Sequence, residues 1–155
     1  MVSFFHKQNQ VINHMYHLKL NDMSKPKFES FQDLFIHELK DLYSVENQLI
    51  EALPEMAEAA SDPQLKRAFE SHLEETKIQK ERLENISTIL DQDLKGEECK
   101  AMKGLIKEGK EIIKSKGNND LRDAALIAAA QRVEHYEIAV YGTVSRFATL
   151  MNKHE

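Results

Sequence analysis

Apolar residues in this chain recur at intervals of three and four over unusually long stretches, and this pattern limits the fold more than any other feature. Ser30 and Asp33 form a capping box that opens the first stretch. The stripe behind it consists of Phe31, Leu34, Phe35, Leu39, Leu42, Leu49 and Leu53. This spacing puts all of its members on one face of an α-helix. We therefore expect a long amphipathic helix, which Pro54 should kink or end.

Two more long helices and one short helix are expected further along the chain. Ser61-Asp62-Pro63 is a start signal for a helix that continues towards Asp91. A shorter helix should cover about 99–116, and the last should run from about 121 to 151. At about 1.5 Å rise per residue, each long helix measures roughly 40 Å. Long helices of matched length with short turns predict an all-α fold, an antiparallel up-and-down bundle.

Composition and charge exclude several classes of protein. The single cysteine, Cys99, leaves no partner for an intramolecular disulfide and favours a reducing compartment, so we expect a cytoplasmic protein. No apolar run approaches the ~20 residues of a membrane span. Residues 29–98 hold 18 acidic and 7 basic side chains, which disfavours nucleic acid as a partner. The lysines at 100–116 are typical of a solvated helix face.

The first 29 residues differ from the rest, because their apolar residues are only loosely periodic. We expect an N-terminal extension at 1–29 in front of a helical bundle domain at 30–155. His6, His14 and His17 fall inside this extension. Three histidines in a polar segment are more often incidental than metal ligands.

Polar residues interrupt the apolar stripe near the middle of each long helix. They are Glu46 in the first helix, His72, Glu75 and Gln79 in the second, and Gln131 and Glu134 in the last, where either Glu137 or Ile138 takes the next inward position. Mid-helix positions of an antiparallel bundle meet at one level, and an unpaired buried carboxylate costs several kcal/mol. A pair of Fe or Mn ions held by inward carboxylates and histidine would satisfy them.

The same carboxylates also allow an ordinary interpretation. Glu46 and Glu134 could pair with Arg82, Arg132 or Tyr136, or reach solvent. For one inward glutamate that interpretation is preferred, whereas interruptions aligned across three helices favour a metal.

Two other reactive side chains also have ordinary interpretations. A lone His72 is more often a hydrogen-bonded core residue than a ligand. Cys99 follows Glu97 and Glu98, and an acidic neighbourhood raises the pKa of a thiol, so no nucleophilic role is expected. The sequence holds no nucleophile triad pattern, phosphate-binding loop or paired-cysteine motif.

Three blocks of sequence resemble the YciE/YciF-type family of bacterial stress proteins, over about residues 30–150. The blocks are Phe31–Phe35 with Glu38–Ser44 and Glu46–Leu49, then Ser71–Thr76, then Arg122–Gln131 followed by Val133–Glu137. The resemblance implies a ferritin-like helical bundle with a di-metal centre, which is often dimeric and linked to stress. It brings no settled enzymatic activity, no catalytic residue and no small-molecule substrate.

Carried over residue by residue, the resemblance implies a set of metal ligands. Glu46, Glu75 and Glu134 come first, followed by His72 and Glu137. Ferritin-type sites usually have a histidine three residues after a glutamate, and this chain does not. Here His72 precedes Glu75, so ferroxidase-like oxygen chemistry does not follow from the resemblance.

A second departure concerns the end of the bundle. Family members continue into a further long helix, which this chain lacks. The expected fold is therefore a ferritin-like antiparallel bundle of three long helices plus one short helix, with the last family helix missing. An apolar stripe left uncovered in this way predicts at least a homodimer.

Two functions remain open at this stage. The first is a stress protein with a di-metal centre of Fe or Mn, which stores metal or consumes a peroxide-type oxidant. The second is a metal-free helical scaffold or oligomerisation protein with a degenerate site. Whether the chain is an enzyme stays open in both.

Overall fold

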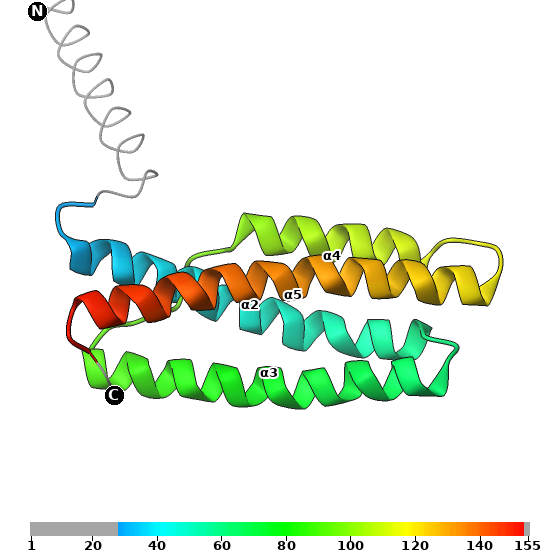
Figure 1. The fold of residues 1–155 in the computed structure, drawn as a ribbon, viewed down its shortest axis with the longest axis horizontal. Coiled ribbons are helices and arrows are strands. Elements are labelled where there is room, and N and C mark those ends of the chain that lie inside the picture. The colour runs from blue at the N-terminus through cyan, green and yellow to red at the C-terminus, as the bar shows by residue number, and fades with distance from the viewer. Residues whose placement is uncertain (1–27, 154–155) are drawn as a thin grey trace, which may run out of the picture. The chain divides into compact units, whose positions relative to one another are not determined.

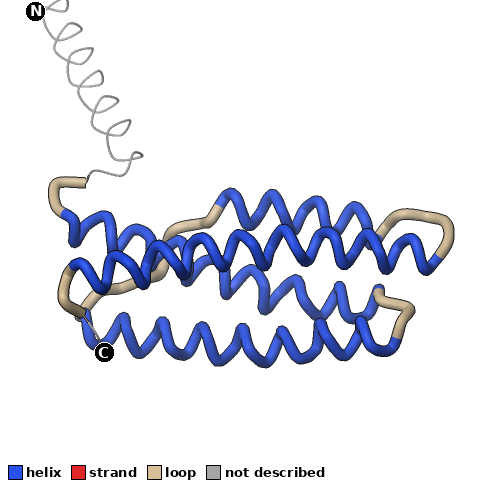
Figure 2. The backbone as a smooth tube through the Cα atoms, viewed as in Figure 1, coloured by secondary structure: helices blue, strands red, loops and turns tan. Residues whose placement is uncertain are grey.

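The computed structural model describes residues 28–153, and the predictions about His6, His14 and His17 lie outside this range. The helices are α2 (Phe31–Ala59), α3 (Pro63–Leu90), α4 (Lys100–Ile113) and α5 (Asn119–Leu150). No strand occurs among the described residues. The predicted all-α class is confirmed (Figure 2), and α2, α3 and α5, at 29, 28 and 32 residues, are the three long helices.

Local capping interactions explain where the helices begin. The backbone amide of Asp33 donates to Ser30 Oγ at 3.1 Å, and the Ser30 amide donates to Asp33 Oδ2 at 2.8 Å, which is the predicted capping box. Asp62 caps α3 by accepting from the amides of Gln64 and Leu65, with Pro63 at the first helical position. These start signals are short-range, so the sequence alone predicts them.

Of the two effects predicted for Pro54, a kink or an end, the end is wrong, because α2 continues past it to Ala59. Two boundaries differ from the sequence prediction. The N-cap of α5 is Asn118, whose side chain accepts from the next two free amides, so α5 begins two residues earlier than expected. The short helix covers 100–113 rather than 99–116, since Cys99 is its N-cap and Lys114 its C-cap.

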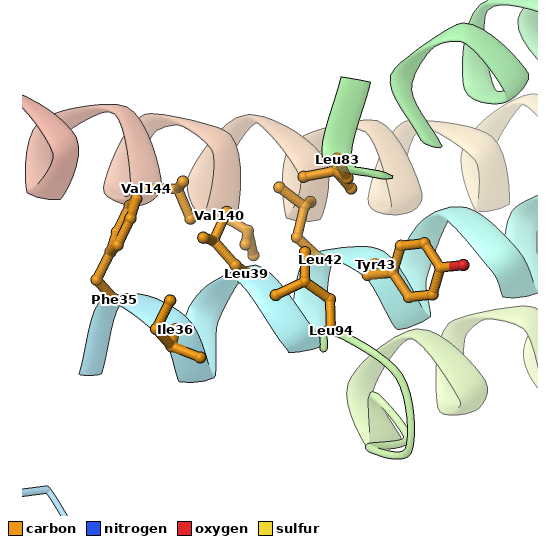
Figure 3. Close-up of a cluster of buried hydrophobic side chains, with 9 residues drawn as sticks. All are labelled: Phe35, Ile36, Leu39, Leu42, Tyr43, Leu83, Leu94, Val140 and Val144. Atoms are coloured by element: carbon orange, nitrogen blue, oxygen red, sulfur yellow. The ribbon is translucent and has the colours of Figure 1, made fainter. Parts of the chain in front are cut away.

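The helices alternate in direction (Figure 1). α2 and α3 form one antiparallel pair, and α4 and α5 form another, with the connection 91–99 between them. Two apolar clusters fill the interior. The first contains Phe35, Leu39, Leu42, Leu83, Leu94, Val140 and Val144, among others, and is drawn in Figure 3. The second contains Val45, Leu49, Leu53, Phe69, Met102, Leu126 and Val133, among others.

α3 contributes less to this interior than its predicted stripe suggests. Its buried residues are Phe69, Thr76 and Leu83, spaced by seven. Of the expected stripe, Leu65, Leu73, Ile86 and Leu90 are only partly buried. α3 therefore meets the other helices along a narrow line, like one edge of a coiled-coil seam.

Polar contacts fix the two hairpins together. Asp123 of α5 is buried and accepts from the backbone amides of Ser61 and Asp62 and from the Ser61 hydroxyl, at 2.8 to 3.2 Å. These bonds bring the turn between α2 and α3 onto α5. At the other connection, the Cys99 amide donates to Ser44 Oγ at 2.9 Å, which ties the start of α4 to α2.

Candidate metal centre

A polar layer separates the two apolar clusters in the middle of the bundle. α2 contributes Glu46, which lies directly after Val45 of the second cluster and is 0% exposed. α3 contributes His72 and the buried Thr76, whose hydroxyl donates to the His72 carbonyl at 2.8 Å. α5 contributes Glu137, which lies between Val133 and Val140, one from each cluster. The predicted mid-helix level of polar residues is therefore present.

His72 and Glu137, together with Glu134 of α5, form a compact group that could hold a cation. His72 Nδ1 lies 3.1 Å from Glu134 Oε1, and His72 Nε2 lies 3.6 Å from Glu137 Oε2. One ligand atom from each of the three residues lies within 4.8 Å of the others. The Glu137 side chain is 7% exposed and that of His72 is 17% exposed, whereas Glu134 is 43% exposed. The group is thus anchored in the core and open to solvent on its Glu134 side.

Glu46 is held next to this group by a tyrosine. The Tyr141 hydroxyl donates to Glu46 Oε1 at 2.6 Å. Burial, and to a smaller extent the charge of Glu137, raise the pKa of Glu46 to about 7. The Tyr141 hydrogen bond and the charge of His72 act in the opposite direction. Burial and the nearby Glu46 carboxylate raise the pKa of Tyr141, so its hydroxyl keeps its proton and remains a donor.

The neighbouring carboxylates favour the charged form of His72. Interaction with Glu137 raises the pKa of His72, with smaller contributions from the charges of Glu134 and Glu75, while burial lowers it. A histidine with this environment favours its charged form in the metal-free protein. Metal binding would displace that proton, because a ligating imidazole is neutral.

Two carboxylate oxygens in this layer are buried without a hydrogen-bond donor, Glu46 Oε2 and Glu137 Oε2. The 3.6 Å separation from His72 Nε2 is too long for a hydrogen bond to Glu137. Buried polar groups in folded proteins nearly always have a partner. A cation bound by both oxygens would supply it, so the donor set fits a metal.

Each residue of the predicted ligand set has a defined place. His72, Glu134 and Glu137 come together, and Glu46 lies beside them with its carboxylate on Tyr141. Glu75 is exposed on α3 and lies outside the three-residue group, although its charge reaches His72. Its role as a ligand stays a prediction.

The sequence offered Arg82, Arg132 and Tyr136 as ordinary partners for Glu46 and Glu134. Among the described residues, none of the three forms a hydrogen bond or ion pair with either glutamate. Tyr136 donates to Asp41 Oδ2 at 2.8 Å, and Arg132 lies 3.8 Å from Glu108. The partner of Glu46 is Tyr141 instead. Tyr141 follows Glu137 by one helical turn, and that spacing is the sequence signal that could have identified it.

Cys99 is not part of the three-residue group and is buried against Tyr136, with Sγ 3.1 Å from the phenol oxygen. Burial is the main cause that raises the pKa of the thiol, and Asp41 adds to it. The predicted direction is therefore correct, whereas the cause is burial and Asp41 rather than Glu97 and Glu98. Because its thiol is buried and its pKa is raised, Cys99 is a structural and unreactive cysteine.

Fold and site together define a class: antiparallel helical bundles with a carboxylate–histidine cluster in the core. The family model "Domain of unknown function (DUF892)" matches residues 30–155, so the chain belongs to that family. It is 50% identical over 121 residues to protein YciF of Escherichia coli strain K12, covering 77% of this chain and 73% of YciF.

Solved structures agree with this assignment. The crystal structure of the E. coli stress protein YciF matches with a TM-score of 0.78 at 47% identity, over 81% of this chain and 80% of that chain. YcfI of Rhodopseudomonas palustris matches with the same score and coverage at 42% identity. The predicted family and ferritin-like bundle are confirmed. Among the described residues, no helix is both long and apolar enough to cross a membrane.

Proposed function

We propose that this protein binds a pair of Fe or Mn ions in its core through His72, Glu134, Glu137 and Glu46, and acts in a stress response. One observation carries the proposal: three helices bring these four side chains to one level between two apolar clusters. Carboxylate and imidazole ligands projecting inward from facing helices are the donor set of di-iron and di-manganese bundles.

The energetics of the layer support a bound cation. Two carboxyl groups, Glu134 and Glu137, flank one histidine, and Glu46 adds a third acidic group to the layer, so acidic groups outnumber the basic one. Leaving carboxylate oxygens buried and unbonded costs about 1–3 kcal/mol or more per group. A divalent cation offsets both the repulsion and the missing hydrogen bonds. His72, Glu134 and Glu137 would hold one ion, and Glu46 together with Glu137 would help to hold a second.

The cellular role is proposed from the relative. E. coli YciF is described as a stress protein. When bound, a pair of redox-active ions supplies electrons for reduction of an oxidant, and the same site could store metal. The partly exposed Glu134 gives solvent access to the centre. We therefore propose metal storage or consumption of a peroxide-type oxidant in the cytoplasm.

A metal titration of paired variants tests this proposal. Fe(II) is added anaerobically, and Mn(II) separately, in competition with a colorimetric chelator. His72→Ala and Glu137→Gln should weaken binding strongly, because each removes a ligand. His135→Ala is the matched control, since His135 follows Glu134 directly on α5, is exposed, and pairs through Nδ1 with the backbone carbonyl of Gln131. Equal affinity of all variants would refute the site.

A metal-free scaffold is the second candidate, and the Tyr141–Glu46 hydrogen bond favours it. That bond satisfies one Glu46 oxygen, and the pKa of about 7 keeps a large fraction of Glu46 protonated at neutral pH. In a scaffold the layer would fix helix register rather than bind metal. Failure of the wild-type protein to bind either ion would select this candidate.

We also propose that the protein is a homodimer or larger homo-oligomer. Large apolar side chains remain exposed on the outer sides of α3 and α5: Ile78, Ile89, Leu121, Ile127, Ile138 and Leu150. Apolar residues are distributed around α5 rather than confined to one face, so some of them face away from the core. Sedimentation equilibrium should give a multiple of 17.9 kDa, and a monodisperse monomer would refute this proposal.

A further inference from the structure

Among the described residues of the polar layer, Tyr141 is neither a carboxylate nor a histidine, and its hydroxyl bonds to the side chain of a proposed ligand. It lies four residues after Glu137 and seven after Glu134, so the three side chains share one face of α5. Its hydroxyl reaches across to α2, where it donates to Glu46 Oε1. At 2.6 Å this is a short O–H···O hydrogen bond.

Because of this bond, the two oxygens of the Glu46 carboxylate have different surroundings. Oε1 is occupied by the phenol, whereas Oε2 is buried without a hydrogen-bond donor. The Glu46 side chain is fully buried, so water cannot replace either partner freely. The carboxylate is thereby held in one orientation with a single oxygen free for another bond.

We propose that Tyr141 is the positioning residue of the metal centre, which restricts Glu46 to one-oxygen ligation through Oε2. The assignment rests on the proposed metal-binding function. Outer hydrogen-bond partners of metal ligands fix ligand orientation, and their loss typically lowers metal affinity about 10- to 100-fold. Without the phenol hydroxyl, Glu46 can rotate and offer both oxygens or neither.

The surroundings of Tyr141 explain which substitution isolates this effect. Its side chain also lines a groove of about 510 Å³ between α3 and α5, beside Leu83, Ile86 and Val144. Tyr141→Phe keeps the ring in this apolar wall and removes only the hydroxyl. Tyr43→Phe is the matched control, because the Tyr43 hydroxyl donates to Glu84, which is exposed on α3, and not to a residue of the polar layer.

The test measures Co(II) and Fe(II) affinity by chelator competition and records the visible spectrum of the Co(II) form. Tyr141→Phe should bind each ion about 10- to 100-fold more weakly and should change the Co(II) bands, which report coordination number and geometry. Tyr43→Phe should match the wild type in both respects. Thermal melting without metal checks that both variants fold.

Each contrary outcome has a distinct meaning. Equal affinity and an unchanged Co(II) spectrum in Tyr141→Phe overturn the positioning role alone. A phenolate-to-Fe(III) absorption band that develops when the Fe(II) form of the wild type is exposed to air, and is absent from Tyr141→Phe, makes Tyr141 a ligand and also overturns the positioning role. Absence of any binding by the wild type overturns the proposed function, and the positioning role with it.

Discussion

Replacing Glu46 by Gln should stabilise the metal-free protein at alkaline pH. Burial raises the pKa of Glu46 from 4.5 to about 7 in the folded chain. The folded state therefore holds this proton more tightly than the unfolded state does. At 1.36 kcal/mol per pKa unit, the difference amounts to about 3 kcal/mol.

The sign of the effect follows from proton linkage. For a carboxyl group whose folded pKa is raised, the stabilisation is complete below pH 4.5 and is lost as the pH rises through 7. Glutamine imitates the neutral carboxyl group at every pH and can still accept from Tyr141. The free energy of unfolding should therefore be similar for wild type and Glu46→Gln at pH 4, with the variant about 3 kcal/mol more stable at pH 8.

Urea unfolding of chelator-treated protein between pH 4 and pH 8 measures this difference. Glu58→Gln is the control, because Glu58 lies exposed on the same helix. Using the difference between variants removes the contributions of groups that do not interact with Glu46. A wild-type-minus-variant difference that stays constant with pH would refute the reasoning. In the presence of Mn(II), the order should reverse, since only the wild type keeps the ligand.

Three other predictions concern the fold. Asp123→Asn should destabilise the protein at pH 7 in urea unfolding, because hydrogen bonds from Ser61 and Asp62 lower the pKa of Asp123. The stabilisation by Asp123 should disappear as the pH falls through that lowered pKa. Equal stability of variant and wild type at pH 7 would contradict the role of these bonds. Cys99 should react with a thiol reagent only as fast as the protein opens, because it is 1% exposed; reaction at the rate of a free thiol would show that the buried position is wrong. Leu126→Ala should cost about 2–5 kcal/mol of unfolding free energy, since the side chain is fully buried in the second cluster, whereas a cost under about 1 kcal/mol would contradict that packing.

The elements of the fold could be predicted because their signals are local. The Ser30–Asp33 capping box, the Asp62–Pro63 start and the spacing of apolar residues each act within a few positions of the chain. The same patterns identified Glu46 and Glu137 as polar residues on apolar faces, and both are buried.

The sequence could not reveal which polar residues meet across helices, because this depends on the rotation of each helix about its axis. His72 and Glu75 share a helical face by spacing, yet the inward line of α3 passes through Phe69, Thr76 and Leu83. Glu75 therefore falls on the exposed side while His72 reaches the layer. The Tyr141–Glu46 bond likewise joins residues 95 positions apart, which no local pattern specifies.

Elemental analysis of protein purified without an affinity tag or chelator tests the central claim most directly. Metal per chain is counted by mass spectrometry for the wild type, for His72→Ala and for the control His135→Ala. A ligated pair in the bundle core predicts about one to two Fe or Mn ions per chain in the wild type and the control, and a loss of most of this metal in His72→Ala. A wild type that holds no metal, even after anaerobic Fe(II) or Mn(II) addition, would contradict the claim.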